Sequence, residues 1–507
     1  MSQTSKRLSP LDMIFLYGET PSTMMHVGAL MPFTPPPDAP PDFLRRLLED
    51  NKNNEVVAPW NRKLSNPHLL YSPTQSWIVD DNFDLDYHVR RSGLASPGDE
   101  RELGVLVSRL HSNPLDLTRP PWEMHFIEGL EGGRFAIYVK IHHSLVDGFT
   151  GMKILARSMS TNPHDRDHPL FFNASTPTKM SSPEPARSGG NVDKVLSGVG
   201  SAVGAVGSAV GFVTGAGRST VDLTKALVNS QLRRDNDYRQ LVSSAQAPHC
   251  ILNKRISRNR RFATQLYEIA RLKTIGAKHD ATLNDVALAI IGGGLRTFLD
   301  GLGELPDKSL IAFVPVNVRP KDDEGGGNAV GAMLAPLGTD IADPVQRLEA
   351  ITSSTRMTKK ELKGMSRNAI LAYSAAIMAP AGLQLSSALT GVRPPWPFAF
   401  NVCVSNVPGP KEVLHFRGSR MEANYPMSIV AHGMALNITL HGYADTLNFG
   451  FIGCRDTLPH LQRLALYTGE ALDALEDATV PRRRSRRQTQ GPSPTIRNPR
   501  KQVSKTT

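Results

Sequence analysis

The sequence predicts a mixed α/β fold built in two halves. Its 507 residues exceed the size of one ordinary hydrophobic core, so two domains or subdomains are expected. Stretches that alternate apolar and polar residues, typical of strands, are interleaved with stretches of helical periodicity along the chain. The hydrophobic content of 40% and the charged content of 21% are those of an ordinary globular protein.

The first half, residues 1–180, contains the clearest strand, from Phe135 to Ile141. One face of this strand carries Phe135, Ile137, Val139 and Ile141, and the other carries Ala136, Tyr138 and Lys140. By the same parity, His143 continues the first face, which we expect to be buried, and His142 points away on the second. A helix-like run from Met152 to Met159 follows.

Residues 181–248 are predicted to form a linker, which follows a Pro- and Ser-rich stretch that begins at Pro163. Within it, residues 195–217 carry no charge, and their valines recur at spacings of four and three, as on one stripe of a helix. A helix packed on another helix or on a membrane surface, a flexible linker and a membrane span remain alternatives. The span is least favoured because only 12 of the 23 residues are apolar and larger than glycine.

The second half, residues 249–480, opens with an Arg-rich, strand-like segment followed by helical patterning from Leu272 to Phe298. A helix from Leu458 to Leu475 is expected to close it. Apolar-polar alternation on both sides of Ala444-Asp445 predicts a hairpin. The predicted strands of this half are Ser309–Asn317, Phe398–Ser405, Ala435–Tyr443 and Thr446–Ile452.

The positive charge of the chain is concentrated at its end. Residues 481–507 contain nine Lys or Arg and no Asp or Glu, so the net charge of +11 falls to +2 without them. This basic tail is interpreted as a disordered solubilising arm or as a segment attracted to anionic lipid headgroups. Nucleic acid is not expected as a partner, because no basic helix, aromatic-interleaved strand or zinc-type spacing accompanies the tail.

The three cysteines, Cys250, Cys403 and Cys454, are sparse and contain no Cys-x-x-Cys pair. They therefore predict neither a disulfide framework nor a structural zinc site, and they fit the reducing cytoplasm. The apolar run from Met13 to Tyr17 is too short for the core of a signal peptide, so we expect no export.

His143, at the end of the predicted strand and before a loop and a helix, is the candidate general base. The strand would fix its side chain while the loop leaves it reachable, and imidazole suits the removal of an alcohol proton near pH 7. Asp147, four residues later, could hold the loop. A core histidine followed by a helix-capping aspartate would produce the same pattern, so these residues alone leave both interpretations open.

The string His142-His143-Ser144-Leu145-Val146-Asp147-Gly148 resembles the active-site motif of the wax ester synthase/diacylglycerol acyltransferase family, of the actinobacterial triacylglycerol synthase type. Matching segments follow in the family's order and together cover nearly all of the expected folded chain. They are residues 7–12, 25–28, 114–123, 284–285, 314–319, 327–328, 405–410 and 431–433. The resemblance implies a chloramphenicol-acetyltransferase-like fold, with two pseudo-symmetric halves around a tunnel for coenzyme A and the alcohol.

The resemblance also implies roles for individual residues. His143 would deprotonate the acceptor hydroxyl, and Asp147 would orient the loop. Asn284 would donate a hydrogen bond to the developing oxyanion or fix the catalytic loop, although it could instead be the N-cap of the helix that follows. That alternative applies more strongly to Asp285. The remaining substrate-binding or supporting candidates are His142, Gly148, Asp285, Asn317 and Arg319.

Two positions depart from the family pattern. Pro121 and Gly338 stand where the family usually has leucine and proline, in its Pro-Leu-Trp and Leu-Pro-Thr motifs. Neither position lies in the motif that contains His143, so the departures bear on substrate preference more than on activity.

The activity that the resemblance implies is acyl-CoA-dependent esterification of diacylglycerol, or secondarily of a long-chain alcohol, at a membrane or lipid-droplet surface. No cofactor or metal is expected, because the chain shows no nucleotide-binding glycine pattern, and no Gly-x-Ser-x-Gly elbow points to a covalent intermediate. Two rivals are a condensation-type transferase that takes its acyl group from a carrier protein, and a lipid-binding protein without turnover.

Overall fold

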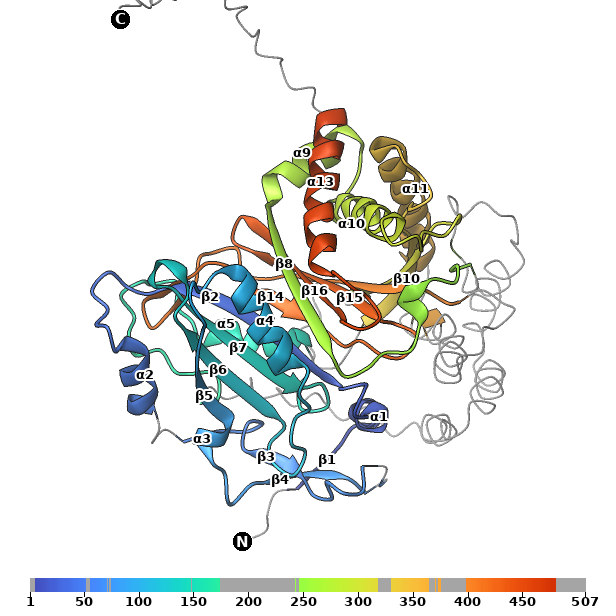
Figure 1. Ribbon diagram of the computed structural model, residues 1–507. Helices are drawn as coiled ribbons and strands as arrows, with labels where there is room; N and C mark the ends of the chain where they lie inside the picture. Colours follow the sequence, from blue (N-terminus) through green and yellow to red (C-terminus); the bar gives the residue numbers. More distant parts are fainter. Residues whose placement is uncertain are drawn as a thin grey trace, which may run out of the picture.

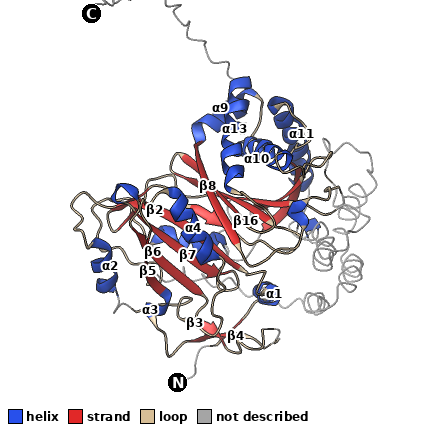
Figure 2. Cartoon of the chain, viewed as in Figure 1, coloured by secondary structure: helices blue, strands red, loops and turns tan. Residues whose placement is uncertain are grey.

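The computed structural model describes residues 5–51, 55–70, 72, 74–146, 148–173, 242, 246–317, 330–363, 370, 373–374 and 398–479. Two large sheets dominate this part of the chain, one in each half (Figure 1). Helices and strands are both abundant (Figure 2), as the sequence predicts for a mixed α/β fold.

The N-terminal sheet has β2 and β7 at its centre and is completed by strands from the second half of the chain. Its order is β12-β13-β2-β7-β6-β5, and β14 also pairs with β2. The strands contributed by the first half are β2 (His26–Thr34), β5 (Val89–Gly93), β6 (Trp122–Glu128) and β7 (Phe135–His142). Those contributed by the second half are β12 (His415–Phe416), β13 (Ser419–Met421) and β14 (Tyr425–Met427).

The C-terminal sheet has the order β10-β9-β11-β15-β16-β8. Helices α9, α10, α11 and α13 gather on one side of it (Figure 1). The strands are β8 (Arg260–Glu268), β9 (Ile311–Asn317), β10 (Val330–Pro336), β11 (Val402–Val407), β15 (Leu436–Tyr443) and β16 (Thr446–Cys454). The helices are α9 (Ile269–Lys278), α10 (Leu283–Asp300), α11 (Pro344–Lys363) and α13 (Gln462–Thr479).

Four strands of each sheet repeat one pattern of pairing. In the N-terminal sheet, β5 is parallel to β6, β6 is antiparallel to β7, and β7 is antiparallel to β2. In the C-terminal sheet, β11 is parallel to β15, β15 is antiparallel to β16, and β16 is antiparallel to β8. The correspondence relates β7 to β16 and supports the expected pseudo-symmetry of the two halves.

Smaller elements complete the fold, most of them around the N-terminal sheet, whereas η2 lies against the C-terminal half. A short sheet has the order β1-β4-β3. These elements are α1 (Pro10–Gly18), α2 (Phe43–Asn51), α3 (Leu85–His88), α4 (Glu100–His111), α5 (Gly148–Arg157), β1 (Lys6–Arg7), β3 (Arg62–Leu64), β4 (Ser76–Val79) and the 3-10 turns η1 (Glu131–Gly133) and η2 (Ile251–Asn253).

Helix α4 joins the two halves. The hydroxyl of Ser108 accepts a hydrogen bond from the Phe262 backbone N–H at 2.9 Å, and the hydroxyl of Ser112 accepts one from the Arg260 N–H at 2.8 Å. Both donors lie in β8. Strands β12 to β14 of the second half also belong to the N-terminal sheet. The two halves are therefore more closely connected than expected from a division of the chain at residues 181–248.

Burial on both faces of β7 corrects one sequence expectation. The predicted alternation is present: Phe135, Ile137 and Val139 join the core of the N-terminal half, whereas Ala136 and Tyr138 join the core that extends into the C-terminal half. The second face is therefore covered by the C-terminal half, and His142 on it is buried, which fits the supporting role expected for that residue.

Other sequence predictions are confirmed or corrected locally. The hairpin around Ala444 forms between β15 and β16. The helical patterning predicted from Leu272 to Phe298 is confirmed as two helices, α9 and α10, which are separated where Asp280 adopts a positive φ of 50° and Thr282 caps α10. Gly338 has a φ of 58°, which proline cannot adopt, so the departure at this position accompanies a distinct local backbone.

Residues 195–217 and the basic tail lie outside the described residues. Within the helices that the structure does describe, none is both long and apolar enough to cross a bilayer.

Candidate active site

His143 follows β7 directly and is held from two directions. Its backbone N–H donates to the carbonyl of Met25 at 2.8 Å, which fixes the start of the loop against β2. The ring of Phe15, from α1, stacks on the imidazole with 3.9 Å between centroids and 21° between planes. The side chain is half-buried. This is a histidine of restricted orientation that remains partly accessible, as a general base requires.

His142 lies in a buried polar environment and is 1% exposed. Its Nδ1 is 3.2 Å from the Ser144 backbone N and 2.6 Å from the Ser144 hydroxyl. Its Nε2 lies 3.5 Å from Oε2 of Glu19. The backbone N–H of His142 donates to the carbonyl of Pro121 at 2.9 Å. Because any residue supplies that carbonyl, proline in place of leucine at this position leaves the hydrogen bond available.

A cluster of charged and polar groups continues along the same face of β7. Lys140 Nζ lies 3.3 Å from Oε2 of Glu123 and donates to the carbonyls of Leu110 and Asn113 at 3.2 and 3.0 Å. Burial lowers the pKa of Lys140, against the opposing effect of Glu123. Burial also lowers the pKa of His26, the residue that pairs with His142 across β2 and β7. These groups form a structured polar layer beneath the histidine pair.

The remaining residues of the histidine motif are only partly described. Asp147 lies outside the described residues. Gly148 is the first residue of α5, and a Cβ added there would meet nothing described within 4 Å.

Asn284 and Asp285 lie at the start of α10, in the C-terminal half. The side-chain oxygen of Asn284, Oδ1, accepts a hydrogen bond from the side-chain Nδ2 of Asn406, near the end of β11, at 2.6 Å. The N-cap of α10 is Thr282, so the interpretation of Asn284 as the N-cap is wrong. Because Oδ1 of Asn284 accepts from Asn406, the NH2 group of the Asn284 side chain is the part that could donate a hydrogen bond to an oxyanion.

Asp285 has a structural position. Its Oδ2 accepts the Thr282 backbone N–H at 2.9 Å and completes a capping box. Its Oδ1 accepts the Thr355 hydroxyl at 2.7 Å and lies 3.6 Å from Lys359 Nζ. Asp285 therefore anchors α10 to α11. Of the other candidates, Asn317 is the last residue of β9, and Arg319 lies outside the described residues.

Sequence reasoning missed Phe15 and Glu19. They lie four residues apart around the end of α1, a spacing that would have indicated a shared side of a helix. No pattern in the sequence, however, connects residues 15 and 19 with the histidines more than a hundred residues later.

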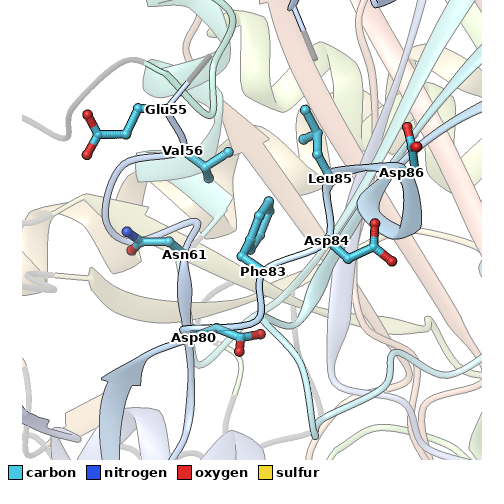
Figure 3. Close-up of a pocket in the computed structure, with 8 residues that line it drawn as sticks. All are labelled: Glu55, Val56, Asn61, Asp80, Phe83, Asp84, Leu85 and Asp86. Carbon is cyan, nitrogen blue, oxygen red and sulfur yellow. The ribbon is translucent and has the colours of Figure 1, made fainter. Parts of the chain in front are cut away.

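A cavity of about 550 Å³ lies elsewhere in the N-terminal half (Figure 3). Its carboxylates would repel the phosphates of coenzyme A, so this cavity does not suit the donor. Its lining residues are Glu55, Val56, Asn61, Asp80, Phe83, Asp84, Leu85 and Asp86. Within the described residues, no group of three or more His, Cys, Asp or Glu side chains could hold a metal ion.

The two-sheet fold of repeated strand pairing, with a fixed histidine where a central strand ends, is shared with proteins of condensation-type architecture. The first condensation domain of a calcium-dependent antibiotic synthetase shows the same fold, with a TM-score of 0.50, 13% identity and coverage of 94% of this chain and 97% of that one. A wax ester synthase/diacylglycerol acyltransferase from Marinobacter aquaeolei VT8 matches with a TM-score of 0.73 and 35% identity, covering 94% of this chain and 99% of that one.

Family models and similar proteins show the family to which the chain belongs. Residues 8–287 match the wax ester synthase/diacylglycerol acyltransferase catalytic domain, and residues 326–476 match the corresponding C-terminal domain. A Mycobacterium tuberculosis protein with the provisional name diacylglycerol O-acyltransferase is 69% identical over 492 residues, covering 94% of this chain and 98% of that protein. The O-acyltransferase WSD of Acinetobacter baylyi is 38% identical over 473 residues, covering 92% and 96%. The chain belongs to the wax ester synthase/diacylglycerol acyltransferase family and is an acyltransferase.

Proposed function

We propose that the protein transfers an acyl group from acyl-CoA to diacylglycerol, and secondarily to a long-chain alcohol, with His143 as the general base. The observation that carries the proposal is the fixed, half-buried imidazole of His143 where β7 ends. The names of the relatives support diacylglycerol and wax-ester alcohols as the acceptors.

In this mechanism His143 takes the proton of the acceptor hydroxyl while the oxygen attacks the thioester carbonyl. A C–O bond forms, and the carbonyl oxygen becomes an oxyanion. Collapse of this intermediate breaks the C–S bond, and the protonated His143 returns the proton to the leaving thiolate. Because the thioester already carries an activated acyl group, neither a metal nor an organic cofactor is required.

Two further residues have proposed roles. The amide of Asn284 would donate to the oxyanion or hold the loop that does, a contribution of about 3 kcal/mol for a donor of this kind. Asp147 would orient the loop that follows His143. Gly148, Asn317 and Arg319 are proposed to support the substrate, while Asp285 acts through the cap of α10.

Action at the surface of a membrane or a lipid droplet, from the cytoplasmic side, is also part of the proposal. Both substrates carry long apolar chains, and α1 presents two large apolar side chains outward beside the site. Ile14 is 45% exposed and Tyr17 is 37% exposed. The basic tail after residue 480 would add attraction to anionic headgroups.

The test is product identification. Purified protein is supplied with radiolabelled palmitoyl-CoA and either dioleoylglycerol or hexadecanol, and the lipids are separated by chromatography. The proposal predicts labelled triacylglycerol and a smaller amount of wax ester. Labelled product from an acyl carrier protein donor, with none from palmitoyl-CoA, would show a condensation-type transferase instead. Lipid binding with neither product would show a protein without turnover.

A further inference from the structure

We infer that Phe15 and Glu19 are positioning residues, which together hold the histidine pair in the geometry for acyl transfer. The inference rests on the proposed role of His143 as the base. Both residues come from one turn of chain: Phe15 lies in α1, and Glu19 is the residue that caps its C-terminal end.

Phe15 restricts the ring of His143. The centroid distance of 3.9 Å and the interplanar angle of 21° describe a stacked pair, in which one face of the imidazole lies against the aromatic ring. The backbone N–H of His143 is fixed separately to the Met25 carbonyl. One contact thus places the main chain of the base, and the other restricts the rotation of its side chain.

Glu19 completes the main-chain restraint. Its Oε2 accepts the backbone N–H of Met25 at 2.5 Å, and the carbonyl of the same Met25 accepts the N–H of His143 at 2.8 Å. A chain of two hydrogen bonds therefore connects the carboxylate to the residue that carries the base. Charge-assisted hydrogen bonds of this kind are stronger than neutral ones, which suits a restraint on a loop.

The same carboxylate selects a tautomer of His142. A backbone N–H can only donate, so the contact from Ser144 N at 3.2 Å makes Nδ1 of His142 the acceptor. The neutral ring then carries its proton on Nε2, which lies 3.5 Å from Oε2 of Glu19. The negative charge favours that proton position, and the tautomer in turn keeps Nδ1 available to hold the loop at Ser144.

Helix α1 is itself firmly placed. The Ser9 and Asp12 side chains form a capping box at its start. Leu16, one residue after Phe15, is fully buried in a cluster with Leu64 and Trp77. A displacement of Phe15 or Glu19 relative to the histidines would therefore require movement of a packed helix.

The test compares full-length variants by steady-state kinetics with palmitoyl-CoA and dioleoylglycerol. Phe15→Leu removes the aromatic plane while keeping an apolar side chain, and Phe15→Tyr restores the plane. Glu19→Gln keeps the size and the acceptor oxygen but removes the charge. Leu466→Ala, at an exposed position of α13 to which no role is assigned, is the control for the loss of an apolar side chain from a helix.

We expect Phe15→Leu and Glu19→Gln each to lower kcat by about 10- to 100-fold, the scale of a misplaced catalytic group, with both KM values within about twofold of wild type. Phe15→Tyr should recover kcat to within about threefold, and Leu466→Ala should match wild type. This split between kcat and KM, with rescue by the conservative variant, separates positioning from a general loss of folded protein.

Three outcomes would overturn the inference. They are unchanged kcat in either folded Phe15→Leu or folded Glu19→Gln, a loss confined to KM, and an equal loss in Phe15→Tyr. If melting curves show that Phe15→Leu is unfolded, Glu19→Gln decides on the same criteria. An inactive wild type would overturn the proposed function together with this inference, whereas active wild type with equally active variants would overturn the inference alone.

Discussion

The buried pair of Glu123 and Lys140 beneath the histidines allows a prediction worked from the structure. Lys140 is 1% exposed and Glu123 is 7% exposed. Burial alone would raise the pKa of Glu123, but His125, whose Nε2 lies 3.6 Å from Oε2, and the charges of Lys140 and Arg90 outweigh it and hold the pKa at about 2. Replacement by glutamine in Glu123→Gln removes the negative charge and leaves Lys140 buried with carbonyl partners only.

The magnitude follows from that pKa. The fall from a usual value of 4.5 to about 2 corresponds to about 3 kcal/mol of stabilisation at neutral pH, which agrees with the cost of breaking a buried pair. Because the pKa is lowered on folding, the stabilisation is fully present above about pH 4.5 and is lost as the pH falls towards 2. The variant should therefore differ from wild type most at neutral pH and converge with it in acid.

The assay is urea unfolding followed by tryptophan fluorescence, at pH 7 and across the acid range. Glu123→Gln should lose about 3 kcal/mol at pH 7, and the double variant Glu123→Gln/Lys140→Met should recover most of that loss, since no buried charge is left unpaired. A loss below about 1 kcal/mol at pH 7, or a difference from wild type that does not shrink in acid, would refute the reasoning.

Three further predictions concern α10 and the junction of the halves. Asn284→Ala should lower kcat by about 100-fold with an unchanged melting temperature, and kcat within threefold of wild type would exclude a role in transfer. Asp285→Ala should cost about 2 kcal/mol in urea unfolding, because both the cap of α10 and the hydrogen bond from Thr355 are lost; no loss of stability would contradict the anchoring role. Gly450→Ala should destabilise the junction by about 3 kcal/mol or prevent folding, because its Cβ would lie 1.8 Å from the carbonyl oxygen of Pro426 in β14. A Gly450→Ala variant with wild-type stability in thermal melts would show that the strands can separate without cost.

Strands with a clear local signal were predictable from the sequence, and β7, β15 and β16 are the best examples. Alternation located β7 within one residue of its observed end, and it located β15 and β16 with their hairpin. The division of Phe135 and Tyr138 between opposite faces was also correct. The burial of the face that carries Tyr138 was not predicted, because the residues that cover this face come from the other half of the chain.

The features that depend on distant contacts could not be predicted. Strands β12, β13 and β14 contain two or three residues each, too few for a periodic signal. Strands β13 and β14 pair with β2, nearly four hundred residues earlier, and β12 pairs with β13. The stacking of Phe15 on His143 depends on where α1 packs. The cap of α10 at Thr282 depends on the break between α9 and α10, which the helical periodicity of the sequence does not show.

The candidate base itself was identified correctly as a residue at the end of a strand, and its catalytic role stays a prediction. Its fixed position required the structure, because three of the residues that hold the histidine pair, Met25, Phe15 and Glu19, lie more than a hundred residues away in the sequence.

The most direct test of the central claim measures thiol release from palmitoyl-CoA, with and without dioleoylglycerol, for wild type and His143→Ala. The proposal predicts acceptor-dependent release by wild type that falls by at least about 100-fold in the variant, the lower range for a general base, at an unchanged melting temperature. Acceptor-dependent release that survives in folded His143→Ala would contradict the claim that His143 is the base.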